Sequence, residues 1–348
     1  MSGRVYLDWN ATAPLRAEAR AAMVAAMDVV GNPSSVHAEG RAARAVLERA
    51  RADLARALGA EGADIVFTSG ATEAAALACA GRGLVCAEVE HEAVLAWCDP
   101  VLKSDRAGRV AVPEPGRAAL QLANSETGVI QALPEGLAVS DLTQAFGKWP
   151  FAFNWLGITA GIVSAHKLGG PKGVGALVIR RGTELVAQIK GGGQEMGRRA
   201  GTENLIGIAG FAAAAKAAQA DLVAGVWDEV AELRSILEKA LEAAGEDVIF
   251  PAAEAERLPN TLCLIAPGWR GETQVMRLDL AGFAISAGSA CSSGKVRASR
   301  VLRAMGYDET AAGCAVRISI GPGVGRDDLL RFAEAWGAAR KRHRERAA

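Results

Sequence analysis

The feature that most constrains the fold is the alternation of short apolar runs with amphipathic or alanine-rich runs over the first two thirds of the chain. Residues 41–58 place their apolar side chains on one face, which predicts an amphipathic helix. Residues 64–70 (DIVFTSG) are typical of a short buried strand, and a second helix is expected directly after Gly70. Further strands are expected at residues 83–91, 118–128 and 175–182. Strands that alternate with helices predict an α/β layer structure with a mostly parallel sheet.

The pattern changes after an alanine-rich helical tract at residues 205–244. Strand-like segments then follow one another at 246–251, 260–268, 282–289 and 315–321, with helix-like segments at 299–306 and 326–342. A chain of 348 residues also exceeds what one hydrophobic core usually organises. We therefore predict a large domain formed by residues 13–246 and a small α+β domain formed by residues 1–12 and 247–348.

The charge balance limits the classes of partner. Lys and Arg together number 39, as do Asp and Glu, so no long-range field attracts the chain to nucleic acid or to an anionic membrane. The N-terminus does not have the pattern of a secretory signal, and the apolar runs are shorter than the ~20 residues of a membrane span. We expect a cytoplasmic protein with neither a membrane partner nor a direct nucleic-acid partner.

The cysteine pattern indicates reduced thiols. The six cysteines have neither CxxC spacing nor the density of a disulfide scaffold, so no zinc site or other metal site is expected. They are Cys79, Cys86, Cys98, Cys263, Cys291 and Cys314.

Lys167 lies in the stretch SAHKLGGPKGVG, between a Ser-Ala-His run and a glycine-rich turn. A lysine is usually a solvated surface charge. This setting, however, can hold the amine partly out of water, which lowers its basicity and lets it form a Schiff base. In FTSGATEA, a helix begins directly after a strand. The free backbone amides at the start of this helix and the Thr72 hydroxyl could bind a phosphate group. A simple N-cap at Thr72 is the alternative.

Four further motifs are open to two interpretations each. His91 and Asp141 follow apolar stretches, where strand ends form sites in such sheets, but each could equally be structural. The run GGGQEMGRRAGTEN is either a flexible loop with an N-cap at Thr202 or a contact to an anion across an interface. Cys291, in SAGSACSSGKVRAS, is either a nucleophile or a small residue in a loop.

Taken in order, these motifs resemble the cysteine desulfurases of the NifS and IscS type, which are pyridoxal-phosphate enzymes of the class V aminotransferase group. The matches extend almost from end to end: YLDWNATAPL, GNPSSVH, IVFTSGATEA, EHEAVL, NSETGVIQ, SDLTQAFGK, SAHKLGGPKGVGAL, GGGQEMGRRAGTEN, GSACSSG and VRISIG. The resemblance implies an aspartate-aminotransferase-like large domain with a mostly parallel, seven-stranded type of sheet. It also implies a smaller α+β domain that carries the catalytic cysteine loop.

The resemblance assigns a role to individual residues. Lys167 would hold pyridoxal 5′-phosphate covalently, His91 would stack on its ring, and Asp141 would pair with the ring nitrogen. Gln144 would donate to the phenolic oxygen of the ring. Thr72, Ser164 and His166 would hold the phosphate, together with Thr202 from the second subunit of a homodimer. The remaining cofactor positions would be Ala71, Asn124 and Ser125. Asn32 and Arg317 would bind the substrate carboxylate.

The implied reaction converts L-cysteine to L-alanine. Lys167 would remove the α-proton, and the Cys291 thiolate would attack the substrate sulfur and become a persulfide. Lys295 and Arg297 would help to lower the pKa of this thiol. An iron-sulfur scaffold or another sulfur-acceptor protein would take the sulfur, and tRNA thiolation is the one indirect link to nucleic acid.

Several positions depart from the family pattern. Ser125, Leu142 and Ala165 replace its usual residues, and residues 129–140 leave no room for the usual crossover helix. Two alternatives therefore stay open. One is a class V aminotransferase or selenocysteine lyase in which Cys291 is incidental, and the other is a catalytically silent sulfur-transfer scaffold.

Overall fold

In the computed structural model, which describes residues 3–245, 247–288 and 298–347, the largest sheet has the strand order β2-β7-β6-β5. Its strands are β2 (Asp64–Thr68), β7 (Gly175–Ile179), β6 (Ala160–Ser164) and β5 (Val139–Asp141). Strand β7 is antiparallel to both of its neighbours, whereas β5 and β6 are parallel.

An extended segment at residues 118–122 continues this sheet beyond β5. The amide of Ala119 donates to the carbonyl of Val85 at 2.8 Å, and the amide of Leu120 donates to that of Val139 at 3.0 Å. The segment thereby joins β5 to the parallel pair β3 (Val85–Ala87) and β4 (Asp99–Leu102). Isolated bridges thus align the four-stranded sheet with β3 and β4, and among these described strands only β7 runs against the others. The α/β fold class is confirmed.

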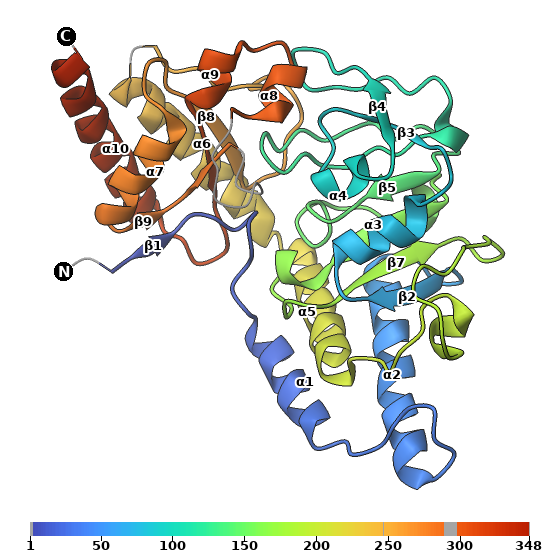
Figure 1. The fold of residues 1–348 in the computed structure, drawn as a ribbon. Helices are drawn as coiled ribbons and strands as arrows, with labels where there is room; N and C mark the ends of the chain where they lie inside the picture. The colour runs from blue at the N-terminus through green and yellow to red at the C-terminus, as the bar shows by residue number, and fades with distance from the viewer. Residues whose placement is uncertain (1–2, 246, 289–297, 348) are drawn as a thin grey trace.

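Side chains on the strands alternate between two layers of helices. Ile65 and Phe67 of β2 face a cluster that contains α1 (Ala17–Met27), α2 (Ala38–Ala57) and α5 (Leu205–Val223). Val66 faces the opposite side, against α3 (Ala71–Cys79) and α4 (Glu92–Leu95). Figure 1 shows α1, α2 and α5 together on one side of the sheet.

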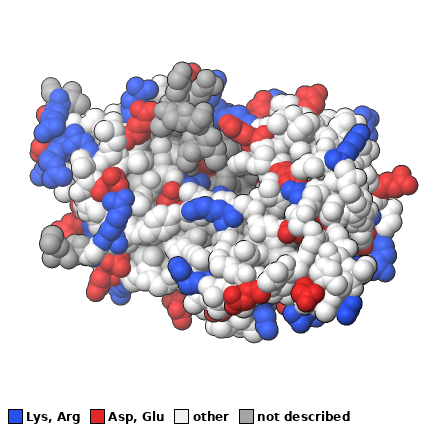
Figure 2. Space-filling view, turned by 60° about the horizontal axis from the view of Figure 1, so that its bottom comes forward, with Lys and Arg blue, Asp and Glu red and all other residues white. Residues whose placement is uncertain are grey.

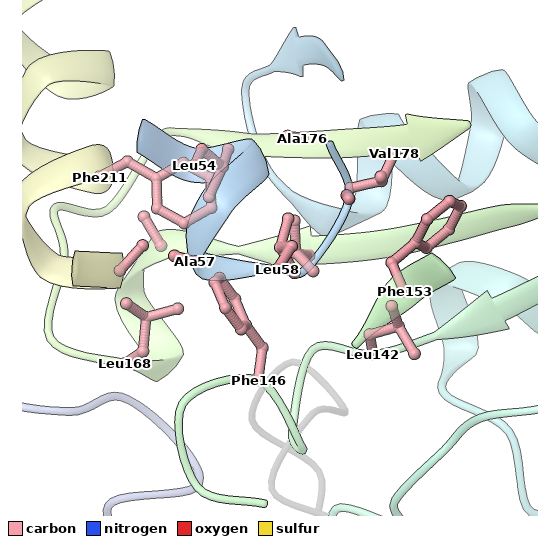
Figure 3. Close-up of a cluster of buried hydrophobic side chains, with 14 of the residues drawn as sticks. Leu54, Ala57, Leu58, Leu142, Phe146, Phe153, Leu168, Ala176, Val178 and Phe211 are labelled. Carbon is pink, nitrogen blue, oxygen red and sulfur yellow. The ribbon is translucent and has the colours of Figure 1, made fainter. Parts of the chain in front are cut away.

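Figure 3 shows the core between α2, α5 and the sheet. Leu54 of α2 lies beside Phe211 of α5, and Leu58 lies near Phe146 and Phe153. By length and composition alone, α5 could cross a membrane. Its contacts with α1 and α2 and its buried side chains, including Phe211, are those of a core helix.

The alanine-rich tract at 205–244 forms two helices rather than one. Helix α5 ends at Val223, and α6 (Val226–Ala244) begins after Gly225. Gly225 adopts a φ of 74°, which glycine accommodates without the steric cost of a side chain. Helix α6 then packs on α10 (Arg326–Ala347).

The C-terminal part contains a smaller antiparallel sheet, ordered β10-β11-β8. Its strands are β10 (Ser286–Ala287), β11 (Ala315–Ser319) and β8 (Thr261–Ile265). Strand β1 (Val5–Tyr6) pairs in parallel with β9 (Phe283–Ala284), and the strand expected at 246–251 is reduced to a bridge between Ile249 and Ile265. The remaining helices are α7 (Gly271–Leu280), α8 (Arg300–Ala304) and α9 (Glu309–Gly313), with single 3-10 turns at Pro115–Arg117, Phe153–Trp155, Ala165–Lys167 and Gln194–Gly197.

The buried side chains of this part form their own cluster. It joins residues of β1 and β8 to Trp269 and to Trp336 of α10. Helix α6 contributes Trp227 and Leu237 to the same cluster. The domain boundaries at residues 12/13 and 246/247 stay a prediction.

Candidate active site

A cavity of about 570 Å³ opens at the sheet edge where the parallel strands end. Ser164 is the last residue of β6, Asp141 is the last residue of β5, and Gly70 closely follows β2. Ligand sites in α/β sheets form at this edge. The cavity gathers most of the predicted site residues, namely Ala71, Thr72, His91, Ser125, Asp141, Gln144, Ser164, His166, Lys167 and Arg317.

Lys167 extends into the cavity from the 3-10 turn that follows β6. Its Nζ donates to the carbonyl oxygens of Asn10 at 2.6 Å and Ala11 at 2.9 Å. Both carbonyls belong to the N-terminal segment, which also lines the cavity. The amine is therefore partly buried and held by backbone acceptors at the place where a carbonyl ligand would meet it.

The end of the cavity near α3 suits an anion. Ala71 and Thr72 begin α3, and the first amides of a helix have no intrahelical partner. Lys172, which was not among the predicted residues, also lines this cavity. Burial lowers the pKa of His166 to about 4, with Lys167 and Lys172 acting in the same direction. A neutral His166 keeps one N–H group to donate.

His91, the N-cap of α4, and Asp141, the last residue of β5, both face the cavity. Nδ1 of His91 accepts a hydrogen bond from the amide of Ala93 at 3.1 Å, so Nε2 carries the hydrogen of the neutral ring. Oδ1 of Asp141 accepts from the amide of Thr143 at 2.9 Å. These two hydrogen bonds orient the His91 ring and the Asp141 carboxylate within the cavity.

Gln144 is oriented by a buried lysine that the sequence interpretation missed. The Nζ atom of Lys148 donates to Oε1 of Gln144 at 2.9 Å and to Oδ1 of Asn10 at 3.1 Å. Lys148 is 1% exposed, and burial lowers its pKa well below the ordinary value. Nε2 of Gln144 then donates to the backbone carbonyl of Asn10 at 3.0 Å. The available signal was a lysine enclosed by aromatic residues in AFGKWPF.

Arg317 reaches the cavity from β11 of the smaller sheet. Its Nη2 donates to Oδ1 of Asp8 at 2.7 Å, and its Nη1 donates to the carbonyl of Ser125 at 3.1 Å. The Nε atom is buried and has no hydrogen-bond partner among the described residues. A guanidinium held in this way has donor capacity left for a carboxylate.

Three predicted residues lie outside the cavity lining. The Asn124 side chain accepts from the amides of Glu126 and Thr127, both at 2.9 Å, and its Nδ2 donates to the carbonyl of Val89. It therefore holds the turn, and its neighbour Ser125 lines the cavity instead. Asn32 and Thr202 are exposed in the single chain, and their roles stay predictions.

Residues 289–297, which include Cys291, Lys295 and Arg297, lie outside the described residues. The residues that flank them, Gly288 and Ala298, are described.

Known proteins are similar to this chain over nearly its whole length. The aminotransferase class-V family model matches residues 5–332. The cysteine desulfurase IscS of Dictyoglomus turgidum (strain DSM 6724 / Z-1310) is 35% identical, over 94% of this chain and 92% of the relative. A cysteine desulfurase of Cereibacter sphaeroides is 39% identical, over 91% and 90%. The solved structure of a NifS-like protein from Rickettsia africae ESF-5 superposes with a TM-score of 0.87 at 29% identity, covering 96% of this chain and 99% of that one.

Proposed function

Because this chain belongs to the aminotransferase class-V family, among the cysteine desulfurases of the NifS and IscS type, we propose that it converts L-cysteine to L-alanine and carries the released sulfur on Cys291. The observation that supports this most directly is the convergence of Lys167, Asp141 and Arg317 on one cavity. An amine, a carboxylate and a guanidinium brought together from separate strands are the groups that amino-acid chemistry on a carbonyl cofactor needs.

The cavity fits pyridoxal 5′-phosphate as the cofactor. Lys167 would hold its aldehyde carbon, the start of α3 with His166 would receive the phosphate, and Asp141 would face the ring nitrogen. A volume of about 570 Å³ lies within the range of small-molecule sites. When bound, this group supplies an electron sink for bonds broken at the substrate α-carbon.

The residues of the chain would bind the substrate and move its proton. The Arg317 guanidinium would bind the α-carboxylate of cysteine and orient the α-carbon toward Lys167. The Nζ atom of Lys167, released from its covalent role, would take the α-proton as the general base. Its backbone acceptors, the carbonyls of Asn10 and Ala11, would hold the protonated amine in place afterwards.

Sulfur transfer requires a second thiol. The Cys291 thiolate would attack the sulfur of the substrate, forming a sulfur–sulfur bond while the carbon–sulfur bond breaks. The carbon skeleton leaves as L-alanine once its β-carbon and α-carbon are protonated. Cys291 then holds a persulfide for an acceptor thiol.

We further propose a cytoplasmic homodimer that passes sulfur to an acceptor protein such as an iron-sulfur scaffold. In such a dimer, Thr202 would reach the phosphate site of the other subunit, because it is exposed and outside the cavity of its own chain. The face of the molecule in Figure 2 intersperses basic and acidic side chains. Contact with nucleic acid would then be indirect, through tRNA thiolation.

The test is incubation of the purified protein with L-cysteine, with and without a thiol reductant. Alanine formation, sulfide release in the presence of the reductant, and a mass increase of one sulfur on the peptide containing Cys291 are expected. The Cys291→Ala variant should bind cysteine and release no sulfide. If alanine forms only when a keto acid is added, or if the variant releases sulfide normally, the chain is an aminotransferase or lyase in which Cys291 is incidental.

A further inference from the structure

Glu126 accepts a hydrogen bond from Ser299, which lies two residues after the segment that carries Cys291. The Ser299 hydroxyl donates to Oε2 of Glu126 at 2.5 Å. A Cβ atom added to Gly288 would lie 3.0 Å from Cβ of Ser299 and 3.5 Å from Oε2 of Glu126. Gly288 and Ser299 therefore lie close together, with little room for a side chain at position 288, and Glu126 contacts Ser299 directly.

The hydrogen bonds of Ser299 leave it little freedom. Its hydroxyl accepts from the amide of Leu302 at 3.1 Å, as the N-cap of α8, while its own hydrogen goes to Glu126. Ser299 is 0% exposed. The backbone amides of Gly288 and Ser299 donate to the carbonyls of Ala315 and Ala312, respectively, both at 3.3 Å. Gly288 is thus attached to β11 and Ser299 to α9, and Glu126 attaches Ser299 to the turn at residues 124–128.

Glu126 also adjoins the substrate end of the cavity. The preceding residue, Ser125, lines the cavity and gives its carbonyl to Arg317. Burial raises the pKa of Glu126 to about 7, although Ser299, Arg317 of β11, Arg300 of α8 and His91 before α4 favour its ionised form. Among the described residues, Cys263 of β8 also interacts with it. The hydrogen bond from Ser299 is therefore accepted by a carboxyl group whose charge changes near neutral pH.

We propose that Glu126 is a positioning residue for sulfur transfer, because it joins Ser299, which follows the Cys291 segment by two residues and lies beside Gly288, to the turn whose Ser125 carbonyl accepts from Arg317. The inference rests on the proposed function. Loss of this link should leave cysteine binding intact, since Lys167 and Arg317 keep their own partners. It should slow the step in which the Cys291 thiol meets the substrate sulfur, where misplacement by about 1 Å costs on the order of a hundredfold in rate.

The experiment separates the two steps in the cofactor-loaded enzyme. Rapid mixing with L-cysteine follows binding through the visible absorbance, and acid quenching with mass spectrometry follows persulfide on Cys291. Glu126→Ala and Ser299→Ala should keep the cysteine concentration for half-saturation within about threefold while the persulfide rate falls at least about tenfold. Ser299→Thr keeps the hydroxyl and should restore the rate.

Two controls separate positioning from general loss of structure. Asp308→Ala removes the N-cap of the neighbouring helix α9, whose side chain accepts from the amide of Ala311 at 2.8 Å, and should leave the persulfide rate unchanged. Glu126→Gln keeps an oxygen acceptor but does not ionise. It should retain more of the rate than Glu126→Ala and should flatten the pH dependence of the persulfide step around pH 7.

The outcomes are distinct. If the wild type makes alanine and Glu126→Ala forms persulfide at the wild-type rate, the inference is overturned while the proposed function stands. The inference is also overturned if Glu126→Ala loses cysteine binding and persulfide formation to the same extent. It is likewise overturned if Asp308→Ala slows persulfide formation as much as Glu126→Ala does. A wild type that makes no alanine from cysteine overturns both.

Discussion

The buried amine of Lys148 donates to Oε1 of Gln144 at 2.9 Å, and this contact sets the orientation of the Gln144 amide. With its oxygen turned toward Lys148, the amide directs Nε2 toward the carbonyl of Asn10. The side chain of Asn10 is fixed in turn, because its Oδ1 accepts from Nδ2 of Asn260 and its Nδ2 donates to Oγ1 of Thr261. The orientation of a cavity residue on the large sheet therefore depends on residues at β8 of the smaller one.

Lys148→Met should impair activity more than stability. Removal of the Lys148 amine relieves the cost of burying it, whereas the unpaired Gln144 oxygen costs about 1–3 kcal/mol. These effects offset, so the free energy of unfolding should change by less than about 2 kcal/mol. The kcat/KM for cysteine should fall about tenfold, because Gln144 can then rotate. Lys216→Met, at an exposed position of α5, is the matched control, and equal kcat/KM values in the two variants would contradict this role of Lys148.

His166 should make the protein lose stability in mild acid. Its pKa is lowered to about 4 in the folded state, so between about pH 6.5 and 4 the unfolded chain binds the additional proton and stability falls as the pH falls. Glu126, whose pKa is raised to about 7, acts in the opposite direction: its contribution is lost as the pH rises from about 4.5 to 7. Because the two contributions oppose each other, the pH dependence of the wild type must be compared with that of a variant that lacks His166.

His166→Gln isolates the contribution of the histidine. Over the range from pH 6.5 to 4, thermal unfolding midpoints of the wild type should fall more steeply than those of the variant. Parallel curves would show that His166 titrates normally in the folded protein.

Alkylation of the native protein should report almost solely on Cys291. The other five cysteines, Cys79, Cys86, Cys98, Cys263 and Cys314, are at most 7% exposed. Burial raises the pKa of the Cys263 and Cys314 thiols, which further suppresses their thiolate forms. Hydrogen bonds from Cys79 and Cys86 instead lower the pKa of Cys98 to about 4, so that thiol is protected by its burial alone. Iodoacetamide should label the native wild type rapidly at one position and Cys291→Ala at none, while both label fully in urea. Rapid labelling of Cys291→Ala would show that a second thiol reacts and would confuse persulfide measurements.

The ion pair between Arg51 and Glu195 should contribute strongly to stability. The Glu195 carboxylate is 1% exposed and accepts from Nη1 and Nη2 of Arg51 at 2.8 and 2.9 Å and from the amide of Phe67 at 2.8 Å. The backbone of Glu195 adopts a positive φ of 48°. Arg51→Met leaves this buried charge without its partner and should lower the free energy of unfolding by about 3–5 kcal/mol.

A second ion pair on the same helix provides the control. Arg56 and Asp53 also lie on α2, but their side chains are 63% and 38% exposed. Arg56→Met should therefore cost less than about 1 kcal/mol. Urea unfolding of both variants measures their free energies of unfolding. Similar decreases in the two variants would mean that the burial of Glu195 does not explain the contribution of the Arg51 ion pair. Glu195→Gln in the Arg51→Met background should recover part of the loss, because an uncharged amide costs less to bury.

Local patterns in the sequence were sufficient for the main parts of the site. The glycine-rich turn after Lys167 and the helix that begins at Ala71 depend on side-chain period and turn chemistry, which neighbouring residues decide. The strand that ends at Ser164 was not among those predicted. The carboxyl ends of parallel strands meet at one edge, which made His91 and Asp141 candidates, whereas the convergence of Lys167, Asp141 and Thr72 was implied by the family resemblance. Motif order added Arg317, which no local pattern connects to the others.

Other contacts were decided only by the packing of distant segments. Asn124 and Ser125 are adjacent and both polar, yet the turn uses the first for its own amides and leaves the second at the cavity. The sequence by itself determined the order of elements and the chemistry available at their ends. The tertiary structure decided the burial of Lys148 and the contact of Glu126 with Ser299, 173 positions away, because desolvation and long-range hydrogen bonds depend on which surfaces the two sheets bring together.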